Sequence, residues 1–200
     1  MEKEILIGKR IKLVPISMEG LDDMHDYSTM PEFFKFFEYE PFKNINETKN
    51  YLERLIMESN SNEINFWFIE IDGKRIIGTF GIVKIDERRK SAELKFGISP
   101  RYWNQGYFSE AMELVLKNLF EKLDFHRIVV LTHVDNAGTI KGLINAGFQR
   151  EGTLRDYLLY ENGERFDVII FSILKNDAGE PLQENPLSST DRIFAAYILP

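Results

Sequence analysis

The chain has 200 residues, 44% of them hydrophobic and 13% aromatic, which is enough for one domain with a substantial core. The absence of cysteine excludes disulfides, thiolate metal sites and a cysteine nucleophile, and we expect no metal. A net charge of −7 without long charged blocks argues against nucleic-acid and membrane partners, and no signal peptide or membrane-length apolar run is present, so we expect a cytoplasmic protein.

The first part of the chain predicts a strand and two helices. Residues 10–16 alternate basic and apolar side chains, as a half-buried strand does. Ser17 and the acidic residues that follow it predict the capped start of a helix. Residues 45–59 space their apolar side chains at helical intervals, so a second helix is expected there.

Residues 30–42 include four phenylalanines and one tyrosine within seven positions. No single face of a helix can hide all five rings. Two interpretations are open: the rings fill the core, or some of them line a substrate cleft or a dimer contact.

Two turn signals then predict three consecutive antiparallel strands. Asp72-Gly73 separates two β-rich runs, and both residues tolerate positive φ. A second turn is expected over 86–90, leading into a strand over 91–99.

The second part of the chain alternates helices and strands. We expect a helix over 106–122, a strand buried on both faces over 125–136, and a short helix that starts at Asn136 and ends at Gly147. A last hairpin should turn at residues 162–163. The element order predicts a mixed α/β fold without repeats.

The composition changes near the C-terminus. Residues 1–176 form the predicted domain, and 177–200 form a linker and tail rich in proline, serine and acids, with an apolar end. That end either frays or docks, on its own domain or on a second copy in a homodimer.

Gly106 lies in a short loop between the predicted strand that ends at Pro100 and the helix that follows. The glycine is either a simple bend or part of an anion site, because unpaired N–H groups and the positive end of a helix bind phosphate. Downstream, Asn136 and Thr139 follow the next strand. If the two strands are parallel neighbours, the Gly106 loop and the pair Asn136 and Thr139 lie at one edge of the sheet, where open α/β sheets bind ligands. Otherwise Asn136 is a helix cap.

Three stretches together resemble the GNAT superfamily of acyl-CoA-dependent N-acetyltransferases, particularly its RimJ/RimL-like branch: ISPRYWNQGYFSEA (98–111), NAGTIKGLINAGF (136–148) and GTLRDY (152–157). The resemblance covers roughly residues 8 to 175. It implies the GNAT fold, a mostly antiparallel sheet of six to seven strands with one splayed parallel pair and helices on both faces. It also implies acetyl-CoA as co-substrate.

The resemblance implies which residues contact acetyl-CoA. Residues 105–109 would offer N–H groups to the pyrophosphate, and the strand residues 96–98 would pair through their backbone with the pantetheine arm. Arg101 and Lys141 would either reach the outer phosphates or remain solvated. The implied residues are Phe96, Ile98, Arg101, Asn104, Gln105, Gly106, Tyr107, Phe108, Ser109, Asn136, Thr139 and Lys141.

The chain departs from the family pattern at five positions. Phe108 stands where alanine or glycine is usual, so its ring must point away from the phosphates or crowd them. Leu143 replaces a tyrosine that other branches use as general acid, Ile144-Asn145 replaces a Glu-Lys pair, and Thr139 replaces serine.

Acetyl transfer to an amine by direct attack through a tetrahedral intermediate needs a base and a donor for the departing thiolate. Glu93 is the first candidate base and His133 the second, with an exposed glutamate and a core-edge histidine as the alternatives. Thr139 is the candidate thiolate donor by the family pattern, unless it is only a first-turn hydroxyl.

The acceptor is expected to contact Phe33, Phe37, Tyr39, Asp156 and Tyr160, where nearby acids could attract an amine. A protein N-terminus or a small amine is expected as acceptor, with aminoglycosides and nucleotide-linked amino sugars as alternatives. A non-catalytic acyl-CoA-binding protein of the same fold is the alternative class.

Overall fold

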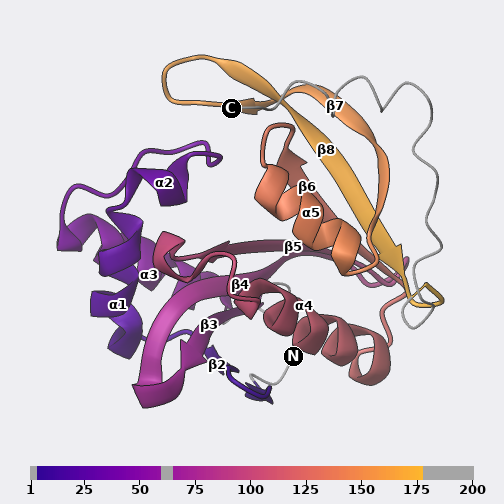
Figure 1. The fold of residues 1–200 in the computed structure, drawn as a ribbon, viewed down its shortest axis with the longest axis horizontal. Helices are drawn as coiled ribbons and strands as arrows, with labels where there is room; N and C mark the ends of the chain where they lie inside the picture. Colours follow the sequence, from indigo (N-terminus) through magenta and orange to yellow (C-terminus); the bar gives the residue numbers. More distant parts are fainter. Residues whose placement is uncertain (1–3, 60–64, 178–200) are drawn as a thin grey trace.

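The computed structural model describes residues 4–59 and 65–177, which fold around one eight-stranded sheet in the order β1-β2-β3-β4-β5-β6-β8-β7 (Figure 1). The strands are β1 Leu6–Ile7, β2 Lys12–Pro15, β3 Asn65–Ile71, β4 Arg75–Asp86, β5 Ser91–Ile98, β6 Arg127–His133, β7 Gln149–Leu159 and β8 Arg165–Leu174. The helices are α1 Leu21–Ser28, α2 Pro31–Phe34, α3 Ile45–Ser59, α4 Tyr107–Lys117 and α5 Ala137–Asn145.

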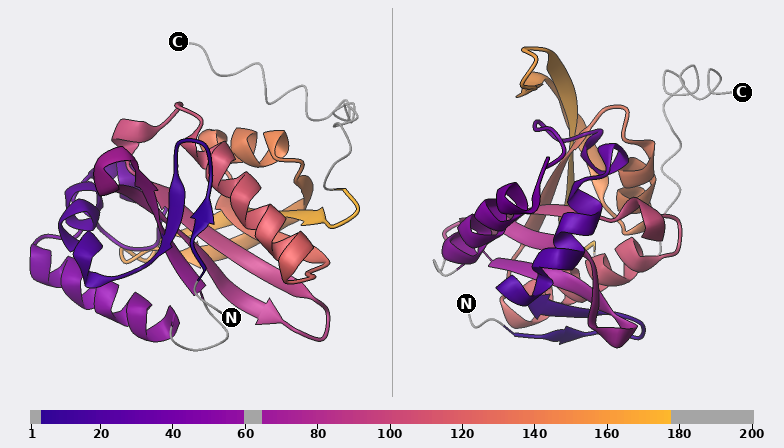
Figure 2. Two further views of the ribbon diagram at one scale, coloured as in Figure 1. Left: turned by 90° about the horizontal axis from the view of Figure 1, so that it is seen from below. Right: turned by 90° about the vertical axis from the view of Figure 1, so that its left-hand side faces the viewer.

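Successive side chains of β3 point to opposite faces of the sheet and supply two cores. Trp67 and Ile69 belong to the apolar cluster that contains the buried side of α4. Phe66 and Phe68 belong to the cluster that contains side chains of α1 and α3. Helices α4 and α5 therefore cover one face of the sheet and α1 and α3 the other (Figure 2).

Strands β5 and β6 are parallel and separate before they end. Residue pairs join Ser91–Leu94 to Arg127–Val130. Both strands continue beyond these pairs, β5 to Ile98 and β6 to His133, without further pairing to each other. The sheet is therefore open between the carboxyl ends of the two strands.

The β7–β8 hairpin projects beyond the rest of the sheet toward the segment between α1 and α3 (Figures 1 and 2). The Leu159 N–H donates to Oε1 of Glu38 at 3.1 Å, which joins the hairpin to this segment. The two parts meet on the sheet face that carries α1 and α3.

The predicted mixed fold with one splayed parallel pair is confirmed, and β1 makes the sheet eight strands rather than six or seven. β1 is two residues long, too short to leave a periodic sequence pattern. The prediction for Ser17 is wrong: it makes no side-chain cap, and a 3-10 turn, Met18–Gly20, precedes α1. The helix expected over 106–122 is α4 followed by a π-helical turn, Asn118–Lys122.

The predicted linker and tail lie outside the described residues, except for Asp177. In the part of the chain that the structure describes, no helix is long and apolar enough to cross a membrane. Among the same residues, no group of histidine and acidic side chains is arranged to hold a metal ion.

Candidate active site

Two helices start at the carboxyl ends of the splayed strands and differ in how they are capped. α4 follows β5 through a 3-10 turn, Pro100–Tyr102, and starts at Gly106, which has φ 81° and no side-chain cap. α5 follows β6 and starts at Asn136, whose Oδ1 accepts from the Thr139 N–H at 3.1 Å. The first N–H groups of α4 are thus left without a side-chain partner beside the opening in the sheet.

Hydrogen bonds within the loop hold its backbone in place. Trp103 Nε1 donates to the Ile98 carbonyl at 2.7 Å, and Gln105 Nε2 donates to the Arg101 carbonyl at 2.9 Å. Asn104 adopts φ 58°, and residues 104–106 are exposed. The loop backbone is therefore fixed and accessible.

Arg10, in the turn between β1 and β2, also contacts this loop. Its Nη1 donates to the Gln105 carbonyl at 2.9 Å, and its Nε donates to Oε2 of Glu110 at 2.9 Å. Its guanidinium lies 4.7 Å from the ring centroid of Tyr107. The start of α4 is thus tied to the N-terminal edge of the sheet.

The splay frees backbone groups of β5. The Ser99 N–H donates to the Ile77 carbonyl at 2.8 Å, which makes these two residues a hydrogen-bonded pair. Because the direction of hydrogen bonding alternates along a strand, the backbone groups of Phe96 and Ile98 point toward β6. Pairing with β6 stops at Leu94, and Trp103 Nε1 takes the Ile98 carbonyl, so the backbone of Phe96 and the Ile98 N–H line the opening.

Phe108 points away from the loop and packs between α4 and α5. Its ring centroid is 4.8 Å from that of Phe96. A Cβ atom added to Gly142 would lie 2.6 Å from Cε1 of Phe108, so the glycine provides the space that the ring occupies. The large side chain at position 108 therefore does not crowd the backbone N–H groups of the loop.

The polar side chains predicted around the phosphates are dispersed. Arg101 is turned toward α1, where its Nη1 donates to Oδ2 of Asp26. Lys141 on α5 and Ser109 on α4 are exposed. Thr139 gives its N–H to the cap of α5, so the capping role left open for Asn136 is present.

Glu93 lies in the paired part of β5, before the splay. Its neighbours Ala92 and Leu94 face the α4 side, so Glu93 points to the opposite face. Its Oε2 accepts from Lys84 Nζ at 2.8 Å, and this hydrogen bond raises the pKa of Lys84. An ammonium group therefore lies directly beside the first candidate base.

His133 is buried at the end of β6, with Phe36 and Phe166 at ring distances of 5.2 and 5.0 Å. Its Nδ1 accepts from the Asp135 N–H at 3.0 Å, so the proton of the neutral ring is on Nε2. Burial lowers the pKa of His133, and nearby Asp135 and Asp167 oppose that effect. Neutral His133 is thus a hydrogen-bond donor toward its surroundings.

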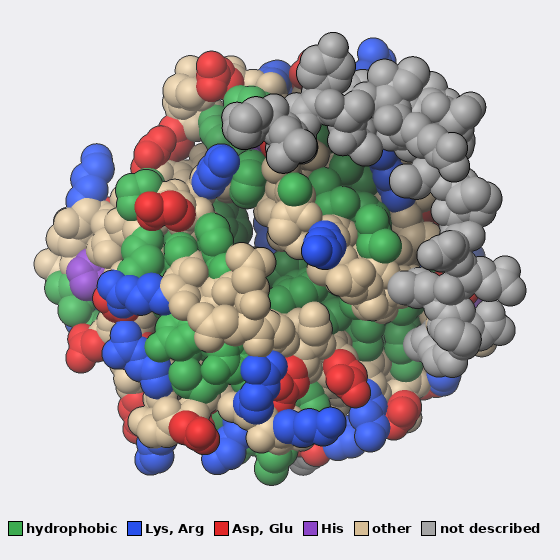
Figure 3. Space-filling model, in the orientation of Figure 1, with side chains coloured by type: hydrophobic (Ala, Val, Ile, Leu, Met, Phe, Trp, Pro, Cys, Tyr) green, Lys and Arg blue, Asp and Glu red, His purple; other side chains and the backbone are tan. Residues whose placement is uncertain are grey.

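Aromatic side chains cover β5 where it leaves β6. A Cβ atom on Gly97 would lie 2.7 Å from Cζ of Phe33 and 3.6 Å from Cζ of Phe37. Phe37 stacks on Phe33 at 5.4 Å and on Tyr39 at 5.8 Å. Figure 3 shows hydrophobic side chains around a hollow between this segment and α5.

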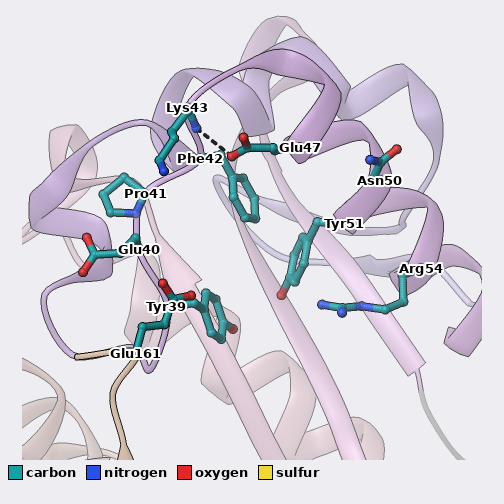
Figure 4. Close-up of a pocket in the computed structure, with 10 residues that line it drawn as sticks. All are labelled: Tyr39, Glu40, Pro41, Phe42, Lys43, Glu47, Asn50, Tyr51, Arg54 and Glu161. Carbon is teal, nitrogen blue, oxygen red and sulfur yellow. Dashed lines mark hydrogen bonds between the residues drawn. The ribbon is translucent and has the colours of Figure 1, made fainter. Parts of the chain in front are cut away.

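The row of stacked rings leads to a pocket of about 390 Å³ between α3, the segment before it and the β7–β8 turn. The rings of Tyr39, Phe42 and Tyr51 line one part of it (Figure 4). Its charged side chains are Glu40, Lys43, Glu47, Arg54 and Glu161. Oε2 of Glu47 accepts from the Lys43 N–H at 2.9 Å. The other charged side chains that line the pocket are two acids, Glu40 and Glu161, and two bases, Lys43 and Arg54.

The two hairpin residues predicted to contact the acceptor are in different surroundings. Tyr160 packs on Phe166 at 4.7 Å, and its buried hydroxyl has no hydrogen-bond partner among the described residues. Burial and then Glu38 raise the pKa of Tyr160. Asp156 is exposed at an irregularity of β7, with φ 52°.

The structure thus gathers the loop over 104–109, the free backbone of β5 and the start of α5 at one edge of the sheet. Four residues that shape this region had no role predicted from the sequence. They are Arg10, Glu110, Phe36 and Gly142. Phe36 stood within the aromatic run, and Glu110 and Gly142 stood within the stretches that carry the family resemblance, whereas no sequence signal marked Arg10.

Residues 10–149 match the acetyltransferase (GNAT) domain family. The uncharacterized N-acetyltransferase p20 of Bacillus licheniformis is 30% identical over 177 residues, which cover 87% of this chain and 98% of that protein. Spermidine N(1)-acetyltransferase of Escherichia coli K12 is 23% identical over 166 residues, 83% of this chain and 87% of that protein.

Solved structures agree in fold. A GCN5-related N-acetyltransferase from Brucella melitensis superposes with a TM-score of 0.79 at 20% identity, covering 88% of this chain and 81% of that one. Spermidine N-acetyltransferase from Vibrio cholerae, in complex with CoA and spermine, gives 0.72 at 22% identity, with 84% and 98% covered. The chain therefore belongs to the GNAT acetyltransferase family and is an acyltransferase.

Proposed function

We propose that this enzyme transfers an acetyl group from acetyl-CoA to the primary amine of a small cationic acceptor. The amine attacks the thioester directly through a tetrahedral intermediate, without an acyl-enzyme. The observation that carries the proposal is the start of α4 at Gly106, which has no side-chain cap, at the same sheet edge as the backbone of Phe96 and the Ile98 N–H, which do not pair with β6. Acyl-CoA has a diphosphate for the first feature and amides for the second.

The residues at this edge suit acetyl-CoA. Gly106 has no Cβ to obstruct the approach of a phosphate, and residues 105–109 carry the N–H groups that would hold it. Because Oδ1 of Asn136 accepts the cap bond, its Nδ2 remains to donate to a pantetheine carbonyl. Bound acetyl-CoA supplies the thioester that the amine attacks.

We assign the base to Glu93 rather than His133, and the reason is the tautomer. Neutral His133 carries its proton on Nε2, while its Nδ1 is occupied by the Asp135 N–H, so the ring has no free lone pair for a substrate proton. Glu93 keeps one carboxylate oxygen free of Lys84 and can accept a proton through water. Thr139 remains the proposed donor to the thiolate.

The rate measured against pH tests this assignment. Glu93→Gln should lower kcat by about a hundredfold and remove the acidic limb, because general base catalysis contributes about 10²–10⁴-fold. His133→Asn should keep the limb where it is. Loss of the limb in His133→Asn, with Glu93→Gln unchanged, would reverse the assignment.

The acceptor is proposed from the rings and acids on the face opposite α4. Phe33, Phe37 and Tyr39 connect the splay to the pocket with Glu40 and Glu161 at its rim. Lys43 and Arg54 balance these two acids, so the rings carry the preference, because aromatic faces favour an ammonium group over a neutral ligand. The spermidine acetyltransferases among the relatives act on an acceptor of this kind.

Release of free CoA thiol with a panel of acceptors tests the proposal. Spermidine and spermine should give amine-dependent release, while peptides with free N-termini, aminoglycosides and amino sugars should give less. Turnover only with peptides would instead support the RimJ/RimL-like assignment. Tight acetyl-CoA binding without release for any amine would contradict the proposed reaction.

A further inference from the structure

We propose that Arg10 is a positioning residue for acyl-CoA, an inference that rests on the proposed function. By holding the Gln105 carbonyl, Arg10 turns the Gly106 N–H toward the diphosphate. Arg10 belongs to the turn between β1 and β2, in another part of the chain from the loop that it controls.

The geometry of one peptide unit carries the first step. In a trans peptide the C=O of one residue and the N–H of the next point in opposite directions, and the described chain has no cis peptide bond. Arg10 Nη1 lies 2.9 Å from the Gln105 carbonyl oxygen. The Gly106 N–H therefore points away from Arg10 and out of the loop.

Glu110 fixes the position of the Arg10 side chain. Oε1 of Glu110 accepts from the Arg10 N–H at 2.7 Å, and Oε2 accepts from Nε at 2.9 Å. A Cβ atom on Gly8 would lie 2.7 Å from Oε1, so this glycine leaves room for the carboxylate. Burial raises the pKa of Glu110, but the bonds from Arg10 and the Lys9 backbone bring it below the ordinary value. The carboxylate is therefore ionised when it holds Arg10.

The guanidinium is suited to this task in a way that an ammonium is not. It bonds Glu110 through Nε and Gln105 through Nη1 while its plane lies over the ring of Tyr107. A lysine has one charged nitrogen and cannot reach both acceptors in a fixed plane. Arg10 also offsets a carboxylate in the first turn of α4, where an unpaired negative charge would repel phosphate.

The test compares donors with and without phosphates. Arg10→Lys and Arg10→Met should each weaken CoA binding, measured by calorimetry, by about tenfold, the usual loss for a charge-assisted hydrogen bond. The preference for acetyl-CoA over S-acetylpantetheine, expressed as the ratio of kcat/KM, should fall by a similar factor. Lys12→Met is the matched control, because it also removes a cation near the N-terminus, and Lys12 Nζ lies 3.9 Å from Oε1 of Glu70 on β3.

The double variant Arg10→Met/Glu110→Gln separates positioning from charge. Affinity should stay low, because the Gln105 carbonyl is still unheld; recovery to the wild-type value would overturn positioning. An equal loss of kcat/KM with acetyl-CoA and with S-acetylpantetheine would mean general damage to the enzyme, and it would also overturn the positioning role of Arg10. Wild-type protein that binds no CoA would contradict the proposed function itself, whereas wild-type binding with unchanged Arg10 variants would overturn this inference alone.

Discussion

The starts of α4 and α5 lie at the same edge of the sheet and are built in opposite ways. α5 is closed by its own sequence, since Oδ1 of Asn136 accepts the Thr139 N–H. α4 starts at a glycine that has no side chain to offer, and its conformation is left-handed. One helix therefore has a side-chain acceptor for an N–H group of its first turn, and the other has none.

The open start needs stability from elsewhere. Glycine at the N-cap costs roughly a few tenths of a kcal/mol relative to a side-chain cap, and other contacts of α4 offset this loss. Ala111, Met112 and Val115 are buried against the sheet, and Arg10 and Glu110 hold the first turn. The two starts therefore differ in what stabilises them: a side chain of its own first turn for α5, and a residue from the turn between β1 and β2 for α4.

Gly106→Val should have the largest effect. A β-branched side chain at φ 81° forces the loop to change, and its Cβ would lie 3.2 Å from Nη2 of Arg10. CoA affinity measured by calorimetry should fall by about a hundredfold, since the N–H groups that bind phosphate move together. The melting temperature should change much less.

Gly163→Val is the control for Gly106→Val. Gly163 also has positive φ, at 85°, with nothing within 4 Å of its added Cβ. The control should carry similar backbone strain and keep its affinity for CoA. Equal affinities for wild type and Gly106→Val would end the view that the open start is the phosphate site.

Phe108 and Gly142 connect the two helices and should give the second largest effect. Phe108→Ala leaves a cavity between α4 and α5 and should lower the free energy of unfolding by about 2 kcal/mol, because the ring is partly buried. CoA affinity should change little, since the backbone at 108 is kept. Urea denaturation measures the first quantity and calorimetry the second.

Gly142→Ala tests the same contact, because it should destabilise the wild type but stabilise the Phe108→Ala variant. In the wild type, the new Cβ would lie 2.6 Å from the Phe108 ring and should destabilise the protein. In Phe108→Ala the clash is gone, and alanine in place of a helical glycine should stabilise by up to about 1 kcal/mol. Destabilisation of equal size in both backgrounds would refute the proposed fit between the two positions.

The sequence predicted those features of the fold and of the site that depend on a few adjacent residues. The three expected turns carry positive φ at Gly73, Lys90 and Gly163, and the Gly106 loop and Asn136 cap each follow from a few adjacent residues. The element order and the family pattern then placed the loop and the cap at one sheet edge. The parallel pairing of β5 and β6 confirms that arrangement.

The features that were missed depend on contacts between distant parts of the chain. Arg10 reads as the start of a strand, and only the folded sheet brings it to Gln105. Phe108 reads as a conflict with the family pattern until Gly142, on another helix, is seen to provide its space. Neither pair has a spacing or periodicity that a single sequence can show.

Asn136→Ala tests the closed start and should have a smaller effect. Removal of the cap should lower the free energy of unfolding by about 1 kcal/mol, measured in urea. Asn136→Ser keeps an oxygen for the Thr139 N–H and should recover most of that stability, but it lacks the amide donor proposed for pantetheine. Its affinity for CoA should therefore stay reduced, and full recovery of both quantities would leave Asn136 with the capping role alone.

The smallest effect concerns His133, which holds the residues that lead into α5. Its Nδ1 accepts the Asp135 N–H and its carbonyl accepts the Asn136 N–H at 3.0 Å. Burial lowers the pKa of His133 below 6.5, so the unfolded chain binds a proton more readily than the folded one, and stability present above pH 6.5 is lost as the pH falls. Melting temperatures at pH 7.5, 6 and 5 should therefore drop more for the wild type than for His133→Asn, which keeps an acceptor for Asp135 without titrating. All other side chains are the same in both proteins, so parallel curves would show that protonation of His133 does not loosen the start of α5.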